Sequence, residues 1–399
     1  MRADLDKLKG VIYGQAIGDA LGLGTEFMTY EDIAKYYPHG LKHYDDIVRD
    51  RHRSRWKRGE WTDDTDMMLC IAAGYIEGST SLSVIAQLFK AWSKDNPMGI
   101  GEHTYKVLLI GDYVEKPHEV SKVIWEISGR KSAGNGGLMR TSIVGLFTEN
   151  VEVCAADICQ LTHYDPRCVG SCVIVSKIIH SLVFEGRAPS YEQIVDWGNK
   201  YDERIKEYID LAHKEDLKAL NLQDDKSIGY TLKTLAAALW AYWNATSFED
   251  GLISIVNAGG DADTNAAVAC AILGAKFGFK NIPKEYVKGL LHKNKLDWAV
   301  ERMTPLQQYY ESNGETVFWL CFLLWPLNYM GKVIHQAHEE MDRMYEKNPS
   351  NPRNVYIDED KRGISLGVTV LGCFLTILWV VFLLTLVIAG VIMLIKLVL

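Results

Sequence analysis

The decisive stretch is Trp-Thr-Asp-Asp-Thr-Asp at residues 61–66, which is nearly repeated as Gly-Asp-Ala-Asp-Thr at residues 260–264. Each stretch stands before a run of small and apolar residues with helical character, at residues 67–73 and 266–273. If the two helix starts face each other, four of their five carboxylates and two of their three threonine hydroxyls could converge. Such an all-oxygen set suits a hard divalent cation such as Mg²⁺ or Mn²⁺.

Helix capping is the simpler explanation of each stretch taken alone. Asp and Thr are favoured N-caps because their oxygens accept from free N–H groups and the helix dipole attracts negative charge. A cap needs one oxygen, however, whereas each stretch carries a pair of aspartates with a flanking threonine. Clustered carboxylates repel one another unless a cation lies among them. The repetition therefore favours a shared metal site.

Further motifs lie before the first acidic stretch and between the two stretches. They are Gly-Gln-Ala-Ile-Gly-Asp-Ala-Leu-Gly at residues 14–22 followed by Glu26, Gly-Ile-Gly at 99–101 with Thr104, Gly-Asn-Gly-Gly-Leu-Met-Arg at 134–140, and Thr-His at 162–163. With these motifs the chain resembles the ADP-ribosylglycohydrolase family, the group that contains dinitrogenase-reductase-activating glycohydrolase and the ADP-ribosyl-acceptor hydrolases. The resemblance covers most of residues 5–300.

The resemblance implies an all-α, compact, orthogonal multi-helix domain with two metal ions, Mg²⁺ or Mn²⁺, in a central cleft. Glu26 matches the family's acidic position beside the metals, and Ala262 stands where many relatives carry a polar residue that is not a ligand. By the same analogy the metal ligands are Thr62, Asp63, Asp64, Asp261, Asp263 and Thr264. The loop expected to hold ADP-ribose comprises Gly134, Asn135, Gly136, Gly137, Leu138 and Met139, since glycine lets backbone N–H groups approach a diphosphate.

Several polar residues near these motifs have two interpretations. Glu26 either contacts metal, controls substrate entry or caps a helix. Asp19 either caps a helix or supports the neighbouring loops and metal ligands. Asp95 is a general base in the cleft or a solvated turn carboxylate. Arg140 contacts substrate or pairs with a buried acid, and His163 faces the substrate or is structural. The catalytic candidates are Asp63, Asp64, Asp261, Glu26 and Asp95.

Helical periodicity extends through residues 1–300, and strand-like alternation is rare and short. The pattern predicts an all-α domain over residues 1–312. The clearest helices are expected at residues 82–92, 105–110, 168–184, 191–212 and 232–245.

The end of the chain has a different character. Residues 364–395 contain no charged side chain and are long enough to span a bilayer, so residues 364–396 are predicted to form a transmembrane helix. Residues 313–330 are an apolar membrane-interface or core segment, and residues 331–363 are a polar linker. Because residues 1–7 are charged and lack an apolar signal region, a single-pass C-terminal anchor with a cytoplasmic catalytic domain is expected.

Net charge and cysteine content indicate which partners and which cellular compartment to expect. The net charge of −8 argues against a general nucleic-acid binder. A run of six basic residues between 49 and 58 is a solvated loop, a diphosphate contact or a contact with anionic lipid. The eight cysteines include no Cys-x-x-Cys pair, which is typical of a reducing compartment.

The predicted function is a dinuclear-metal-dependent hydrolase that removes ADP-ribose from protein side chains, at an N- or O-glycosidic bond, at a membrane. Its partners would be an ADP-ribosylated protein or ADP-ribose, and the bilayer. Two alternatives stay open: a non-catalytic ADP-ribose-binding or scaffold protein, and a hydrolase of a small ADP-ribose derivative. Loss of the carboxylates would have favoured the non-catalytic protein, and all of them are present.

Overall fold

The computed structural model describes residues 2–76, 79–80, 82–95 and 97–304. These residues lie in one compact unit, Met1–Tyr309. The predicted interface segment at 313–330, the linker at 331–363 and the transmembrane helix at 364–396 lie outside the described residues. The domain boundary at residue 312 and the C-terminal anchor therefore stay predictions.

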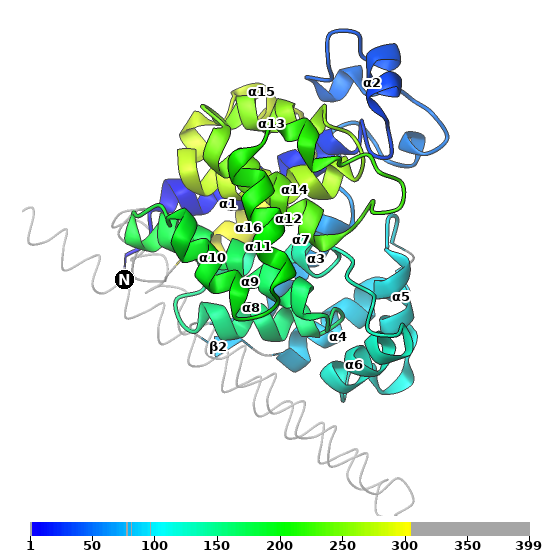
Figure 1. Cartoon of the computed structure of the whole chain (residues 1–399), viewed down its shortest axis with the longest axis vertical. Helices are drawn as coiled ribbons and strands as arrows, with labels where there is room; N and C mark the ends of the chain where they lie inside the picture. The colour runs from blue at the N-terminus through cyan, green and yellow to red at the C-terminus, as the bar shows by residue number, and fades with distance from the viewer. Residues whose placement is uncertain (1, 77–78, 81, 96, 305–399) are drawn as a thin grey trace, which may run out of the picture. The chain divides into compact units, whose positions relative to one another are not determined.

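Helices make up nearly all the regular structure of the described residues, which confirms the predicted helical class (Figure 1). The α-helices are α1 (Leu5–Gly22), α2 (Tyr30–Tyr36), α3 (Asp63–Gly74), α4 (Leu82–Lys94), α5 (Glu102–Leu109), α6 (Pro117–Ile127), α7 (Leu138–Thr141), α8 (Val151–Gln160), α9 (Pro166–His180), α10 (Tyr191–Asn199), α11 (Arg204–Lys214), α12 (Thr231–Asn244), α13 (Phe248–Val256), α14 (Ala262–Phe277), α15 (Lys284–Gly289) and α16 (Lys293–Met303).

Short elements join these helices. The 3-10 turns are η1 (Tyr44–Asp46), η2 (Arg53–Arg55), η3 (Gly111–Tyr113), η4 (Ser142–Leu146), η6 (Leu217–Leu220) and η7 (Phe279–Asn281), and η5 (Ser181–Glu185) is a π-helical turn. A two-residue antiparallel hairpin, β1 (Tyr75–Ile76) with β2 (Ser79–Thr80), is the exception to an all-helical fold in the described part of the chain.

One expected helix is divided in two. The run predicted at residues 191–212 is α10 and α11, separated at Lys200–Glu203. Asp202 accepts the backbone N–H of Arg204, the first residue of α11, at 2.9 Å and also pairs with the Arg204 guanidinium, which stabilises the start of the second helix. The apolar periodicity continues across this break, which explains why the pattern alone predicted one helix.

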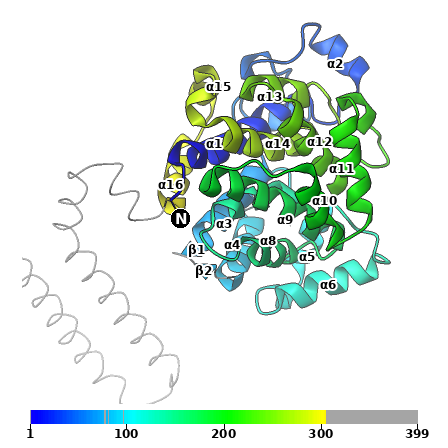
Figure 2. The same ribbon diagram turned by 60° about the vertical axis from the view of Figure 1, so that its left-hand side comes forward.

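Helices α1 and α14 lie side by side at the centre of the domain (Figures 1 and 2). A Cβ atom placed on Gly14 or Gly18 would lie 2.2 or 2.1 Å from a carbonyl oxygen of α14. Gly10 lies four residues before Gly14, and Gly22 lies four residues after Gly18. A Cβ atom on Gly10 or Gly22 would likewise clash with the carbonyl oxygen of Gly274 or Ala262. The two backbones therefore touch along their whole length, which only glycine permits on α1.

This contact runs antiparallel, because Gly10 meets the end of α14 and Gly22 meets its start. The first residues of α14 therefore lie beside the last turn of α1. Most residues of both helices are buried, since neighbouring helices cover their other faces. The helix pair places residues 22–26 next to residues 261–264, far apart in the sequence.

One further run of the described residues, Pro166–Glu185, is long and apolar enough to cross a membrane by length and composition. Its most apolar window is 83% buried inside the domain. This run consists of α9 and η5, which pack against α8, η4 and α12. We interpret it as a core helix of the domain.

Gly18→Ala is expected to lower the free energy of unfolding by about 3 kcal/mol, because overpacking at rigid backbone cannot relax. The added methyl would meet the Ala266 carbonyl at 2.1 Å. Urea denaturation followed by circular dichroism measures the change. Gly111→Ala is the matched control, since a Cβ there meets nothing within 4 Å. Equal stability of the two variants would contradict the backbone contact.

Candidate functional site

The two acidic stretches meet in one cavity of about 870 Å³. The Thr264 hydroxyl donates to Asp64 Oδ1 at 3.3 Å, which joins the start of α14 to the start of α3. All six predicted metal ligands line this cavity, as does Glu26: they are Thr62, Asp63, Asp64, Asp261, Asp263 and Thr264. The sequence expectation that the two helix starts face each other is fulfilled.

Asp19, on the buried helix α1, fixes the start of α3. Its Oδ1 accepts the Thr62 N–H at 2.9 Å, and its Oδ2 accepts the Thr65 N–H at 3.0 Å and the Thr65 hydroxyl at 2.6 Å. Burial raises the pKa of Asp19 to about 7, against the lowering effect of these hydrogen bonds. Asp19 thus takes the capping role, which leaves the side chains of the aspartates that follow Thr62 free to face the cavity.

A pair of glycines brings Glu26 to the start of α14. Gly259 and Gly260 have φ of +68° and +67°, a region that favours glycine. The turn they form exchanges backbone hydrogen bonds with the segment after α1: Gly260 N–H donates to Met28 O at 3.1 Å, and Phe27 N–H donates to Gly260 O at 2.6 Å. Residues 26–28 are therefore tied directly to the residues that precede Asp261.

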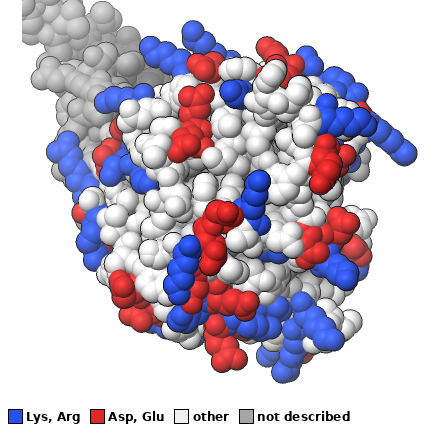
Figure 3. Space-filling model, turned by 45° about the horizontal axis from the view of Figure 1, so that its top comes forward, with Lys and Arg blue, Asp and Glu red and all other residues white. Residues whose placement is uncertain are grey.

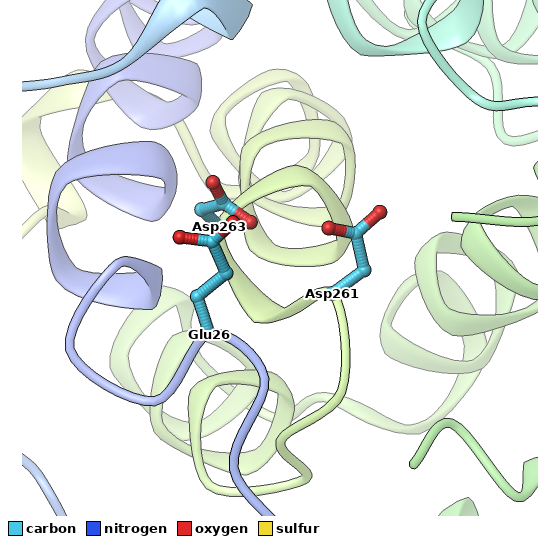
Figure 4. A group of neighbouring side chains, drawn as sticks. All are labelled: Glu26, Asp261 and Asp263. Atoms are coloured by element: carbon cyan, nitrogen blue, oxygen red, sulfur yellow. The ribbon is translucent and has the colours of Figure 1, made fainter. Parts of the chain in front are cut away.

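Glu26, Asp261 and Asp263 form the tightest group of acids in the cavity. One carboxylate oxygen from each lies within 4.8 Å of the others, a spacing that could hold a metal ion. Figure 4 shows Glu26 approaching from the loop after α1 and both aspartates from the start of α14. His52 Nε2 lies 2.6 Å from Glu26 Oε2 and holds that carboxylate in place.

The electrostatics of this group also fit a cation. Burial, followed by repulsion from neighbouring carboxylates, raises the pKa of Asp63, Asp64 and Asp263 well above the usual range. Burial and Glu26 raise the pKa of Asp261 to about 6. Three buried oxygens have no hydrogen-bond partner among the described residues: Thr62 Oγ1, Asp64 Oδ2 and Asp263 Oδ1. Acceptors of this kind, left without donors, match the needs of a hard divalent ion.

The glycine-rich loop lines the same cavity and contacts these acids through Asn135. Asn135 N–H donates to Gly229 O at 2.9 Å, and its side-chain amide donates to Asp261 Oδ2 at 2.6 Å. Asn135 therefore links the loop to the acidic group. Of the residues predicted to hold ADP-ribose, those lining the cavity are Gly134, Asn135, Gly136, Met139 and His163.

Gly137 and Leu138 do not line the cavity. Leu138 is the first residue of α7 and is fully buried. A Cβ on Gly137 would lie 2.9 Å from Cys159 Sγ, so this glycine allows α7 to pack closely on α8. Both residues support the loop from behind.

Asp95 lies outside the main cavity. It is exposed at the end of α4 and lines a separate, smaller cavity together with Trp92 and Lys295. The chain turns there, since Asp95 N–H donates to Trp92 O at 3.1 Å. This position fits the solvated-turn interpretation and does not support a role as general base.

Most of the basic run at residues 49–58 serves the local backbone. Arg53 is buried and donates to Gly24 O, Glu26 O and Asp50, while Arg49 and Arg58 donate to nearby carbonyls. Arg55 lines the main cavity, where it stacks on Trp56 at 4.4 Å. The solvated-loop and lipid interpretations therefore do not apply to Arg53. Figure 3 shows basic and acidic side chains interspersed on the face it presents.

Sequence reasoning missed several residues that line the cavity. Most of them stand near motifs that were recognised, which is the signal that could have found them, whereas Ile228 and Gly229 stand near none of those motifs. They are Phe27, His52, Trp56, Met98, His103, Ile228 and Gly229.

Comparison with known proteins agrees with the geometry. A model of the ADP-ribosylglycohydrolase family matches residues 1–313. The ADP-ribosylarginine hydrolase Tri1 of Serratia proteamaculans is 29% identical over 312 residues, 75% of this chain and 79% of that protein. The ADP-ribosyl-[dinitrogen reductase] glycohydrolase of Rhodospirillum rubrum is 29% identical over 305 residues, 74% of this chain and 92% of that protein.

A solved structure shares the fold. A chain of an "ADP-ribosylglycohydrolase-related protein complex" superposes with a TM-score of 0.59 at 23% identity, covering 75% of this chain and 97% of that one.

The family match identifies this helical domain as a hydrolase of glycosidic bonds. The chain belongs to the ADP-ribosylglycohydrolase family. The predicted resemblance and the predicted enzyme class are both confirmed.

Asp19→Asn is expected to weaken Mn²⁺ binding at least tenfold, roughly the effect of altering a group that orients metal ligands. An asparagine offers one acceptor oxygen, and its NH₂ group would face an N–H donor at the start of α3. Titration calorimetry measures the affinity. Asp4→Asn is the matched control, because Asp4 caps α1 at 3.1 Å from Asp6 N, away from the cavity. Unchanged Mn²⁺ affinity in Asp19→Asn would exclude this positioning role.

Gly136→Ala is expected to weaken ADP-ribose binding by about tenfold, or about 1.4 kcal/mol. The added Cβ would lie 2.9 Å from His163 Cε1 and 3.1 Å from Thr104 Oγ1, so the loop or the imidazole must move. Calorimetry with ADP-ribose measures the loss. Gly101→Ala is the control, since Gly101 lines the same cavity but a Cβ there meets nothing within 4 Å. Equal affinities would show that the loop tolerates a side chain.

Proposed function

We propose that the protein is a dinuclear-metal-dependent hydrolase that releases ADP-ribose from modified protein side chains. One observation carries the proposal: two acidic stretches from opposite ends of the domain meet at one cavity, and several of their buried oxygens have no donor among the described residues. A carboxylate cluster of this kind is costly unless cations neutralise it. The glycine-rich loop beside it supplies close backbone approach for a nucleotide.

The ligand set divides between two helix starts. Thr62, Asp63 and Asp64 would hold cations from α3. Asp261, Asp263 and Thr264 would hold them from α14, with Glu26 beside them. We propose two ions, Mg²⁺ or Mn²⁺, because six oxygen-bearing side chains and Glu26 exceed what one octahedral ion takes from protein. When bound, the ions supply Lewis-acid polarisation and orient the ribose hydroxyls.

The reaction joins a water oxygen to the anomeric carbon of the ribose while the glycosidic bond breaks. One water hydrogen stays on the new hydroxyl, and the other ends on the leaving side-chain atom. The chain's own residues bind the ADP-ribose at Gly134–Gly136 and orient the ribose at the acidic end. The cavity walls, including Trp56 and Met98, shield the reacting bond from bulk water.

The linkage we propose first is the N-glycoside of arginine. Two curated relatives of this chain, at 29% and 28% identity, are named ADP-ribosylarginine hydrolase. The relative from Rhodospirillum rubrum is named for a modified protein, dinitrogen reductase. These names support a protein substrate, and we propose the serine O-glycoside as the second linkage.

The full chain is expected to release ADP-ribose from an ADP-ribosylated arginine peptide when Mg²⁺ or Mn²⁺ is present. Asp63→Asn and Asp261→Asn are each expected to lose at least a hundredfold in kcat/KM, because each removes a charged group from the metal site. A coupled assay of free ADP-ribose measures release. Asp196→Asn, exposed on α10, is the control.

The outcomes of this assay separate the candidate functions. Release from a serine peptide alone would change the linkage and leave the hydrolase intact. ADP-ribose binding without release from either peptide would favour a non-catalytic binding protein or a small ADP-ribose derivative as substrate. Full activity of Asp63→Asn at limiting metal would contradict the metal role.

We also propose that residues 364–396 anchor the enzyme in a membrane with residues 1–312 in the cytoplasm. The support is the uncharged apolar run in the sequence alone. Protease added outside sealed cells is expected to leave the domain intact, and added after permeabilisation to cleave it. Cleavage from outside would reverse the orientation, and recovery of the full chain in a carbonate-washed soluble fraction would remove the anchor.

A further inference from the structure

We propose that Arg140 and Thr162 are positioning residues that hold His163 as a neutral imidazole with its proton on Nε2. His163 then presents an N–H donor to the cavity beside the glycine-rich loop. The inference deepens the proposed function and rests on it in one respect only: the acceptor is taken to be an oxygen of bound ADP-ribose.

Arg140 is fully buried without an acid. Its Nη1 donates to Gly136 O at 2.8 Å and its Nη2 donates to Thr162 Oγ1 at 2.7 Å, while the guanidinium lies 4.6 Å from the centre of the Phe89 ring. No carboxylate pairs with it among the described residues. Of the two interpretations of Arg140, pairing with a buried acid is therefore not borne out. Burying a charge without an acid partner lowers the stability of the fold, and a role in the neighbouring cavity would account for its presence.

The hydrogen bond from Arg140 determines which atom is the donor in the hydrogen bond between Thr162 and His163. A guanidinium has five donors and no acceptor, so Thr162 Oγ1 must accept from Arg140. The single hydroxyl hydrogen of Thr162 then points to His163 Nδ1, 2.8 Å away. If Nδ1 were protonated instead, that hydroxyl hydrogen would be buried with no acceptor among the residues that the structure describes, an arrangement that native proteins avoid.

His103 reinforces the same arrangement. Its Nε2 lies 2.9 Å from Thr162 O, a carbonyl that only accepts, so Nε2 carries the proton. Its Nδ1 then accepts from the Ser132 hydroxyl at 2.9 Å. The His103 and His163 rings lie 4.7 Å apart, between centroids. Burial, then the neighbouring His103 and Arg140, lower the pKa of His163 well below its usual value, which favours the neutral form.

The remaining nitrogen of His163 faces the cavity. His163 lines that cavity, and a Cβ built on Gly136 would lie 3.1 Å from its Nε2. Nε2 has no acceptor among the described residues, whereas Nδ1 is occupied. Arg140 lies directly behind the loop, where its positive charge favours a negatively charged oxygen in front. The diphosphate of ADP-ribose offers such an oxygen.

This assignment also restricts what His163 can do. An imidazole whose Nδ1 accepts and whose Nε2 is protonated has no free lone pair to take a proton from water. His163 therefore binds substrate and does not serve as the general base. Because a diphosphate contact is the same in the ground and transition states, loss of it should raise KM and leave kcat nearly unchanged.

Nitrogen-15 spectra of the full chain, labelled at histidine and without substrate, test the tautomer directly. The His163 signals, assigned by their loss in His163→Gln, are expected to show Nε2–H in the wild type and in Thr162→Ser. In Thr162→Val, which removes the hydroxyl at nearly equal volume, they are expected to show a mixture with Nδ1–H. An Nδ1-protonated His163 in the wild type overturns the proposal whether or not Thr162→Val folds.

Binding and kinetics test the consequence. Thr162→Val is expected to raise the Kd for ADP-ribose and the KM about tenfold with kcat within twofold, and Thr162→Ser is expected to restore both. A merely structural role for Thr162 would lower kcat and stability together. Wild-type affinity in Thr162→Val overturns the proposal. If no peptide is hydrolysed, the proposed function fails, but the spectra and the Kd for ADP-ribose still test the assignment of the His163 proton. The two proposals can therefore fail independently.

Discussion

The contact between the backbones of α1 and α14 is the constraint on which the rest of the domain depends. Four glycines spaced by four residues let the two helices touch without intervening side chains. The approach brings the end of one helix to the start of the other, and Asp19 on the same helix holds the start of α3. The geometry of the acidic group therefore depends on the core helices, together with the Gly259–Gly260 turn that holds Glu26 beside Asp261.

The carboxylates are held together against their mutual repulsion. Burial and neighbouring negative charge both disfavour ionisation of Asp63, Asp64 and Asp263, yet hydrogen bonds from protein satisfy only part of the group. Rigid helices prevent these side chains from moving apart into water. The free energy that folding loses here is recovered when cations bind, so metal affinity and folding stability are linked.

Much of this could be predicted from the sequence, because the two acidic stretches each begin a helix and their residue types limit the chemistry. The glycines at 10, 14, 18 and 22 also carried a signal: their spacing of four marks one helix face, matched by small residues on α14. The position of Asp95 and the missing acid partner of Arg140 could not be predicted, since both depend on which way a turn or a packed side chain points. Apolar periodicity likewise continued through the break at Asp202.

The walls of the cavity differ in how deeply their residues are buried. The acidic wall is held by α1 and α14, two largely buried helices whose amides should exchange with solvent only when the whole domain opens. The opposite rim, with Phe27, Arg55 and Met98, consists of exposed residues on connecting segments. Evolution can therefore remodel the rim for new modified proteins while the chemical centre stays unchanged. Divergence within such a family should accumulate at the rim, residue by residue, long before it reaches the helix pair.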